Sequence, residues 1–210
     1  MNLEHRSDAA AEPIRVLLIE DSGADAQLVQ AYLAESETND VHFVLEHVAS
    51  LAAGLDALAH GEFEAVLLDL ALPESYGIET LHRTHRQCPD VPIVVLTGLE
   101  EKGLGVEAVK AGAEDYLAKS WLEPKLLERT IRHAIERFAH RRADQERAES
   151  DMRYRTLFEQ SPDGVLLIDP ETLAALEFNH SACRQLESSR EEFSRRTVFD
   201  YEAREAPDEV

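Results

Sequence analysis

Five polar residues of this 210-residue sequence lie at the ends of short apolar runs, and their types suit one chemistry. Glu20 and Asp21 follow the first run, Asp69 closes the third, Thr97 ends the fourth, and Lys119 follows the fifth. Taken singly, such residues are more often solvated or helix-capping groups. Three carboxylates brought together would repel one another, so they predict a bound divalent metal, and their all-oxygen donor set favours magnesium. An ammonium and a hydroxyl beside that metal predict a pocket for a phosphoryl group.

The apolar runs predict the strands that would bring these residues together. Three of the runs are nearly continuous Val, Leu and Ile, which is typical of strands buried on both faces. Strands that alternate with helical patterns indicate βαβ units and a parallel sheet, with the ligand site beyond the carboxyl ends of the strands. We therefore expect five strands and five helices of an α/β fold, with strands at 14–19, 41–48, 65–70, 92–97 and 116–118.

The helices between these strands are predicted from apolar residues three or four positions apart. Each group should form the face of a helix that packs on the sheet. The expected faces are Leu28, Val29, Tyr32 and Leu33; Leu51, Leu55 and Leu58; Ile78, Leu81 and His85; and Val106, Val109 and Lys110 with Ala108.

Three segments then carry a resemblance to a known family. VLLIEDSGADAQLVQAYL, VLLDLALPESYGIETL and IVVLTGLEEKGLGVEAVKAGAEDYLAKS together resemble a response-regulator receiver domain of two-component signalling, over about residues 13–138. The five polar positions match that family in order and spacing. The resemblance implies a doubly wound (βα)5 parallel sheet of the flavodoxin-like class. It also implies a sensor histidine kinase or phosphotransfer protein as partner.

The resemblance assigns roles to the polar residues. It implies that Asp69 is the phosphoacceptor and that Glu20, Asp21 and Asp69 hold Mg²⁺, with the backbone carbonyl of Ala71 as a further protein ligand. Thr97 would be the hydroxyl that moves onto the phosphoryl oxygens, and Lys119 the cation that binds them. Tyr116, three residues before Lys119, stands where the family keeps an aromatic switch. Homodimers of the family often use the face of the fourth helix, fifth strand and fifth helix.

The sequence departs from the family at two places. Ser120 follows Lys119 where the family usually has proline, often after a cis peptide bond. A cis bond before a residue other than proline costs about 2.5 to 4 kcal/mol, so the loop after Lys119 is expected to differ. Ala71 and Leu99 stand where polar residues usually tune dephosphorylation. Neither side chain can orient an attacking water molecule, so we expect a long-lived phosphoryl group.

Residues 123–152 are predicted to form the fifth helix and a connector. Glu123-Pro124 is a plausible helix start, and the sequence contains neither Gly nor Pro until well past Arg153, the expected end. The expected apolar face is Leu127, Ile131, Ala134, Ile135 and Phe138. The stripe thins beyond Phe138, leaving two interpretations: a solvated helix, or a parallel dimer helix that carries a signal out of the receiver.

Residues 153–210 resemble the first part of a PAS domain. The matching features are Phe158, the turn at 161–164, the expected strand 165–168 and Asn179 at the start of the next helix. A whole PAS domain needs about 100 residues, so this α+β segment is expected to be partial, and it implies no haem or flavin. For the rest of the sequence, we expect a disordered tail over residues 1–12 and a receiver core over residues 13–122.

Charge and composition exclude several classes. The net charge is −21, and residues 1–122 carry −15 of it. Such acidity disfavours direct binding to nucleic acid or to anionic membranes. We find no apolar run long enough to cross a bilayer and no apolar signal segment at the N-terminus, so we expect a cytoplasmic protein. Two distant cysteines argue against a disulfide framework or a zinc site.

Two other functions stay open at this point. A pseudo-receiver would bind partners without phosphorylation, and Ser120 is the one feature in its favour. An aspartate-nucleophile phosphohydrolase also uses an Asp after a strand with magnesium, but it needs a second Asp two residues later, where Ala71 stands. The sequence contains no kinase ATP-binding core and no cyclase signature, so we expect a phosphoacceptor rather than an enzyme with an external substrate.

Overall fold

The computed structural model describes residues 13–36, 41–98, 104–172 and 174–193. The predicted tail at residues 1–12 lies outside this part. The chain divides into two compact units, Met1–Arg142 and Ala143–Val210, which are described separately. Within the described residues, no helix is both long enough and apolar enough to span a membrane.

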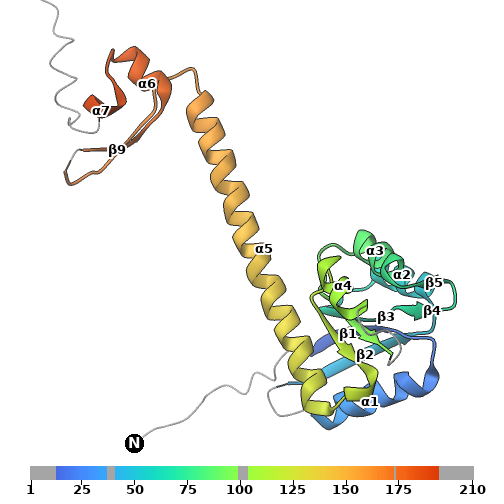
Figure 1. Ribbon diagram of the computed structural model, residues 1–210. Coiled ribbons are helices and arrows are strands. Elements are labelled where there is room, and N and C mark those ends of the chain that lie inside the picture. Colours follow the sequence, from blue (N-terminus) through green and yellow to red (C-terminus); the bar gives the residue numbers. More distant parts are fainter. Residues whose placement is uncertain (1–12, 37–40, 99–103, 173, 194–210) are drawn as a thin grey trace, which may run out of the picture. The chain divides into compact units, whose positions relative to one another are not determined.

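A five-stranded parallel sheet forms the centre of the first unit (Figure 1). Its spatial order is β2-β1-β3-β6-β7, so the strand order reverses at β1 and β3. All five residues of β3 and of β6 are buried, as their continuous apolar sequences predict. The strands are β1 (Ile14–Ile19), β2 (Phe43–Val48), β3 (Ala65–Asp69), β6 (Ile93–Thr97) and β7 (Asp115–Ala118). This arrangement confirms the predicted fold class.

Helices cover both faces of this sheet. Val16 and Leu18 of β1 point into a core shared with α1 (Gly23–Ser36) and the first turns of α5. Leu17 and Ile19 point into the opposite core, because successive side chains of a strand alternate between faces. That second core is shared with α2 (Leu51–His60), α3 (Ile78–Gln87) and α4 (Leu104–Lys110).

The predicted face of α4 is right at Ala108 and wrong at the two valines. Ala108 is fully buried, but Val106 and Val109 are 49% and 42% exposed. A Cβ atom on Gly105 would lie 2.2 Å from Cδ2 of Tyr116, so this glycine lets the ring lie directly against the helix. Gly105 and Ala108, and not the valines, therefore face the protein.

The first turns of α5 (Pro124–Gln160) pack as predicted. Leu127, Ile131 and Ala134 are fully buried, and the helix begins at Pro124. Its end lies beyond the predicted one, because the sequence offers no helix-breaking residue until Ser161-Pro162. All side chains from residue 139 to 157 are exposed.

A buried carboxylate joins α5 to the residues at the start of β7 within the first unit. The side chain of Glu114, which is 3% exposed, accepts hydrogen bonds from Arg141 at 3.0 and 2.5 Å. Arg137 donates to the carbonyl of Glu114 at 3.1 Å and to Asp115 Oδ2 at 2.9 Å. This cluster of Glu114, Asp115, Arg137 and Arg141 joins the start of β7 to the helix.

The second unit contains a two-stranded antiparallel sheet, β8 (Leu166–Ile168) and β9 (Ala175–Phe178), followed by α6 (His180–Gln185) and α7 (Arg190–Phe193). Asn179 is fully buried and caps α6, its Oδ1 accepting from the amides of Ala182 and Val165. Its Nδ2 donates to the carbonyls of Phe158 and Asp163, both at 2.9 Å. The predicted start of a helix at Asn179 is thus confirmed.

Candidate functional site

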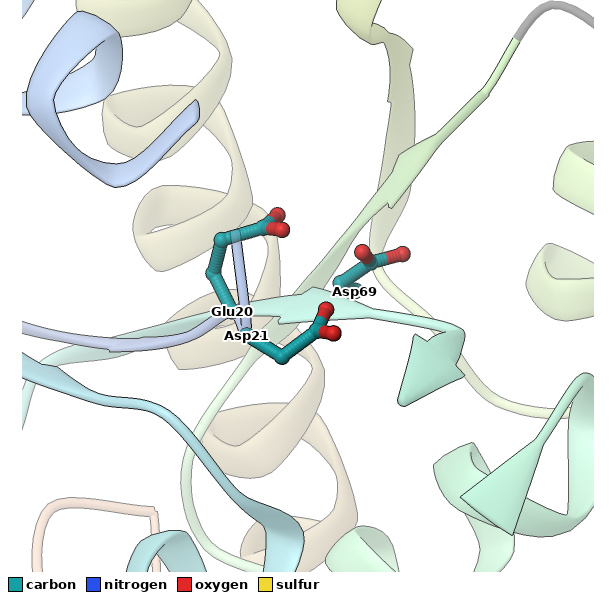
Figure 2. A group of neighbouring side chains, drawn as sticks. All are labelled: Glu20, Asp21 and Asp69. Atoms are coloured by element: carbon teal, nitrogen blue, oxygen red, sulfur yellow. The ribbon is translucent and has the colours of Figure 1, made fainter. Parts of the chain in front are cut away.

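Three carboxylates meet at the carboxyl edge of the sheet, next to the reversal of strand order. Glu20 and Asp21 follow β1, and Asp69 ends β3, which pairs with β1. One oxygen of each residue lies within 4.8 Å of the others (Figure 2). Glu20 and Asp69 are buried whereas Asp21 is exposed, so the cluster opens to solvent on one side.

Glu20 carries the clearest electrostatic perturbation. Burial raises the pKa of its carboxyl to about 7, with a further contribution from Asp69 and an opposing one from Lys119. Its Oε1 accepts from the amide of Ser22 at 3.1 Å. Its Oε2 lies 2.6 Å from Lys119 Nζ as an ion pair, but outside hydrogen-bond geometry, and no other described group donates to it.

Glu20 Oε2 bears on whether a metal fits. It is buried and accepts no hydrogen bond, and the ammonium of Lys119 is its one cationic neighbour among the described residues, so it keeps a lone pair for a metal ion. Three carboxylates without a nitrogen or sulfur ligand form a hard donor set, which suits Mg²⁺. The triad of Glu20, Asp21 and Asp69 is the metal site that the resemblance in the sequence implies.

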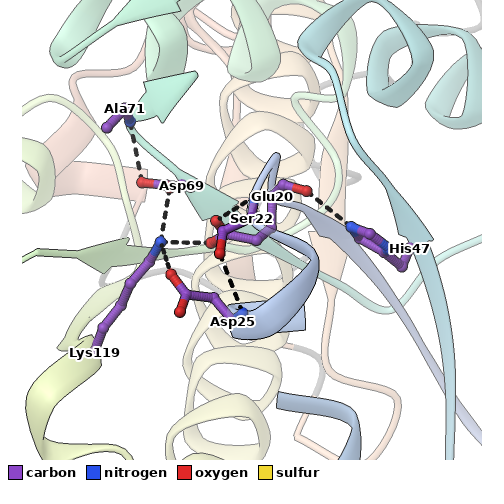
Figure 3. A network of polar contacts seen from close by, with 7 residues as sticks. All are labelled: Glu20, Ser22, Asp25, His47, Asp69, Ala71 and Lys119. Carbon is purple, nitrogen blue, oxygen red and sulfur yellow. Dashed lines mark hydrogen bonds and ion pairs between the residues drawn. The ribbon is translucent and has the colours of Figure 1, made fainter. Parts of the chain in front are cut away.

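Lys119 contacts three carboxylates in the polar network (Figure 3). Its Nζ lies 2.6 Å from Glu20 Oε2, 2.9 Å from Asp25 Oδ2 and 2.8 Å from Asp69 Oδ2. Burial alone would lower the pKa of Lys119, but the three carboxylates outweigh it and raise the pKa above its ordinary value. Lys119 therefore stays protonated and positively charged at the centre of the site.

Asp69 is held from two sides. Its Oδ2 accepts from Lys119 at 2.8 Å, and its Oδ1 accepts from the amide of Ala71 at 3.0 Å. Ala71 belongs to a short hairpin of β4 (Ala71–Leu72) and β5 (Ser75–Tyr76), which the sequence pattern did not predict. Two-residue strands contain too few positions for any periodicity to show. The role of the Ala71 carbonyl as a metal ligand stays a prediction.

Thr97 and Tyr116 lie in different surroundings. Thr97 is buried at the end of β6, one position beyond the partner of Asp69 in the parallel register, and so lies at the carboxylate edge. Tyr116 pairs with Val95, two positions before Thr97, and its ring lies against Gly105 of α4 with 41% exposure. The structure thus brings Thr97 toward the carboxylate cluster and leaves Tyr116 on the α4 side.

After Lys119 the chain forms a short 3-10 turn, Lys119–Trp121, before α5. The described part of the chain contains no cis peptide bond, including the one before Ser120. Leu99, which stands at the other position expected to affect the rate of dephosphorylation, lies outside the described residues.

Asp25 is the site residue that the sequence analysis missed. An acidic residue in the first turn of a helix is commonly explained by the helix dipole alone. Its position four residues after Asp21, at the amino end of the helix that follows β1, was the available signal. The long-range contact with Lys119 could not be read from that spacing, because it spans 94 residues.

Comparison with known proteins agrees with this geometry. Residues 16–131 match the response regulator receiver domain family, and residues 152–210 match the PAS fold. The chain is 32% identical over 106 residues to the transcriptional regulatory protein QseB of Haemophilus influenzae, and 30% identical over 133 residues to the regulatory protein LuxO of Vibrio vulnificus. These matches cover 50% and 63% of this chain but only 46% and 28% of the two relatives.

Solved structures show the same fold. Full-length FixJ from B. japonicum superposes with a TM-score of 0.55 at 30% identity, over 69% of this chain and 68% of that chain. A CheY-like receiver domain protein from Methanospirillum hungatei gives a TM-score of 0.53 at 23% identity, over 62% of this chain and 99% of that chain. At 23% identity, the similarity to the Methanospirillum hungatei protein shows a shared fold and nothing further.

Proposed function

Because the chain belongs to the response-regulator receiver family, we propose that Asp69 accepts a phosphoryl group from the phosphohistidine of a sensor histidine kinase or a phosphotransfer protein. The observation that carries this proposal is the placement of Asp69, whose buried carboxylate contacts Lys119 beside two further carboxylates at an edge open to solvent. Receiver domains in general partner with histidine kinases. We place this chemistry in the cytoplasm as part of the same proposal.

The transfer itself is a nucleophilic displacement. A carboxylate oxygen of Asp69 attacks phosphorus, the P–N bond to the histidine breaks, and the imidazole nitrogen leaves with the bonding pair and takes up a proton. Lys119 contacts the phosphoryl oxygens, and Thr97 donates its hydroxyl to one of them. Glu20, Asp21, Asp69 and the Ala71 carbonyl would hold Mg²⁺, which when bound neutralises charge on the transferred group.

We further propose that the phosphorylated receiver acts through α5 on the PAS region. The cluster of Glu114, Asp115, Arg137 and Arg141 supports this route, because it joins the strand of Tyr116 to the helix that leads out of the receiver. A homodimer through α4, β7 and α5, or through the connector part of α5, belongs to the proposal. Val106, Val109 and Tyr116 give the first of these faces an exposed apolar surface.

The test is phosphorylation of the full chain by acetyl phosphate with and without Mg²⁺. We expect stable label on Asp69 only when the metal is present, and no label in Asp69→Asn. Asp56→Asn is the matched control, because this exposed carboxylate of α2 lies outside the site. Label that persists in Asp69→Asn would overturn the assignment. Absence of label in the wild-type chain would indicate a pseudo-receiver, and release of phosphate without labelled protein would indicate a phosphohydrolase.

A further inference from the structure

The ammonium of Lys119 has more carboxylate partners than the proposed reaction uses. Glu20 belongs to the metal triad and Asp69 is the proposed nucleophile, whereas Asp25 has no assigned role. Asp25 comes from the first turn of α1, and its Oδ2 lies 2.9 Å from Lys119 Nζ (Figure 3). Asp25 is not one of the five polar residues from which the sequence predicted the site.

The loop before α1 holds Asp25 in a defined place. The amide of Asp25 donates to Ser22 Oγ at 3.3 Å, and the amide of Ser22 donates to Glu20 Oε1 at 3.1 Å. The backbone of Asp25 is therefore linked through Ser22, by two hydrogen bonds, to Glu20 of the metal triad. Asp25 is also the most exposed of the three partners, with 40% of its side chain accessible against 0% for Glu20 and 5% for Asp69.

A primary ammonium has three N–H donors, and three carboxylates surround this one. Only the contacts with Asp25 and Asp69 are hydrogen bonds, and Glu20 Oε2 is an ion-pair partner, so a phosphoryl oxygen that binds Lys119 competes with three anions for the ammonium. Asp25 is the partner that yields at least cost, because water can solvate its carboxylate once Lys119 leaves, whereas Glu20 would stay buried without a countercharge. The negative charge of Asp25 also repels an approaching dianionic phosphoryl donor.

We propose that Asp25 is a positioning residue that holds Lys119 on the α1 side of the site and competes with the phosphoryl group for its ammonium. The inference rests on the proposed phosphoacceptor function, and it concerns the rate of that reaction. Removing the charge of Asp25 weakens its contact with Lys119 and removes one anion from the entrance. Phosphorylation should then become faster, although Lys119 loses one charged partner.

The experiment compares initial rates of labelling by acetyl phosphate at saturating Mg²⁺ in the full chain. We expect Asp25→Asn to be labelled about three- to tenfold faster than wild type, as one unit charge in a partly exposed site would produce. Asp25→Glu keeps the charge and can still reach Lys119, so it should return the rate to near the wild-type value. Glu35→Gln removes one exposed charge from the far end of the same helix and should leave the rate unchanged.

A second measurement does not depend on phosphorylation. Acetic anhydride modifies free amines, and mass spectrometry of the Lys119 peptide reports how firmly its ammonium is held. We expect Lys119 to be acetylated several times faster in Asp25→Asn, and at the wild-type rate in Asp25→Glu and Glu35→Gln. A wild-type chain that takes no label would refute the proposed function, and acetylation would then decide whether Asp25 restrains Lys119. Labelling or acetylation of Asp25→Asn at the wild-type rate would overturn the inference.

Discussion

Ala71 leaves the surroundings of Asp69 without a polar side chain at one of the positions that normally tune dephosphorylation. Its amide holds Asp69 Oδ1 at 3.0 Å, but its exposed methyl group can neither donate to nor accept from a water molecule. We expect Ala71→Asn to shorten the lifetime of the phosphorylated chain by roughly tenfold or more, because an amide there can orient the attacking water. The decay of labelled protein after removal of acetyl phosphate measures this.

Ala34→Asn is the control for that experiment, because it places the same amide on an exposed position of α1 away from the site. Its phosphoryl lifetime should equal that of the wild-type chain. A wild-type lifetime of only seconds would contradict the argument from Ala71.

Cys88 is a thiol that the protein keeps unreactive. It is 6% exposed, and burial, with a contribution from Asp90, raises its pKa from 9.0 to about 11. The thiolate is the reactive form, so near pH 8 this shift lowers its population roughly a hundredfold. We expect Ellman's reagent to modify Cys183, which is only partly buried, well before Cys88 in the native chain.

Cys183→Ser should then leave a native chain without a rapidly reacting thiol, and unfolding in guanidinium should expose Cys88. Fast modification of Cys88 in the folded Cys183→Ser chain would show that the thiol is accessible.

The acidic site was predictable from sequence where strand ends fix the positions of side chains. Glu20, Asp21, Asp69 and Lys119 come together because parallel strands end at a common edge. Asp25 escaped prediction because its contact depends on the direction in which α1 leaves that edge.

At the start of β7, the buried carboxylate of Glu114 connects the receiver sheet to α5. Glu114→Gln keeps the shape but removes the charge that faces Arg141 and Arg137. Because the side chains of Arg137 and Arg141 are 46% and 62% exposed and water can solvate them, we expect a loss of only about 1 kcal/mol in the free energy of unfolding. Urea unfolding monitored by circular dichroism measures this loss.

Asp90→Asn is a matched control for Glu114→Gln. Asp90 also pairs with an arginine of α5, Arg142 at 3.1 Å, but its side chain is 70% exposed. An exposed pair of this kind contributes roughly 0 to 0.5 kcal/mol. Equal losses in the two variants would mean that burial of Glu114 adds nothing to the attachment of α5.

The elements themselves were predictable to different degrees. β3 and β6 were clear from their continuous apolar sequences, since both of their faces are buried. The inward face of α4 was predicted only at Ala108, because its other member is Gly105 and a hydrophobicity pattern gives a glycine little weight against two valines. The end of α5 was placed too early, because the thinning of its apolar stripe indicates loss of packing and not loss of helix.

The two units differ greatly in how much apolar surface they bury. Among the described residues, the second unit has a core of two buried side chains, Phe178 and Ala182, whereas the two cores of the first unit contain sixteen and fourteen. Burial of apolar surface is the main favourable contribution to folding, so the second unit should be the less stable. We expect two transitions in differential scanning calorimetry of the full chain, with the second unit unfolding first.

Two variants assign these transitions. Asn179→Ala removes the buried side chain that caps α6 and satisfies two carbonyls, so it should lower only the first transition. Leu81→Ala leaves a cavity at a fully buried position of α3 and should lower the temperature of the second transition only. We expect it to reduce the free energy of unfolding of the first unit by about 2 to 5 kcal/mol. If both variants shifted one common transition, the continuous helix α5 would have to couple the folding of the two units. The proposed phosphorylation of Asp69 would then reach the PAS region as a change in stability.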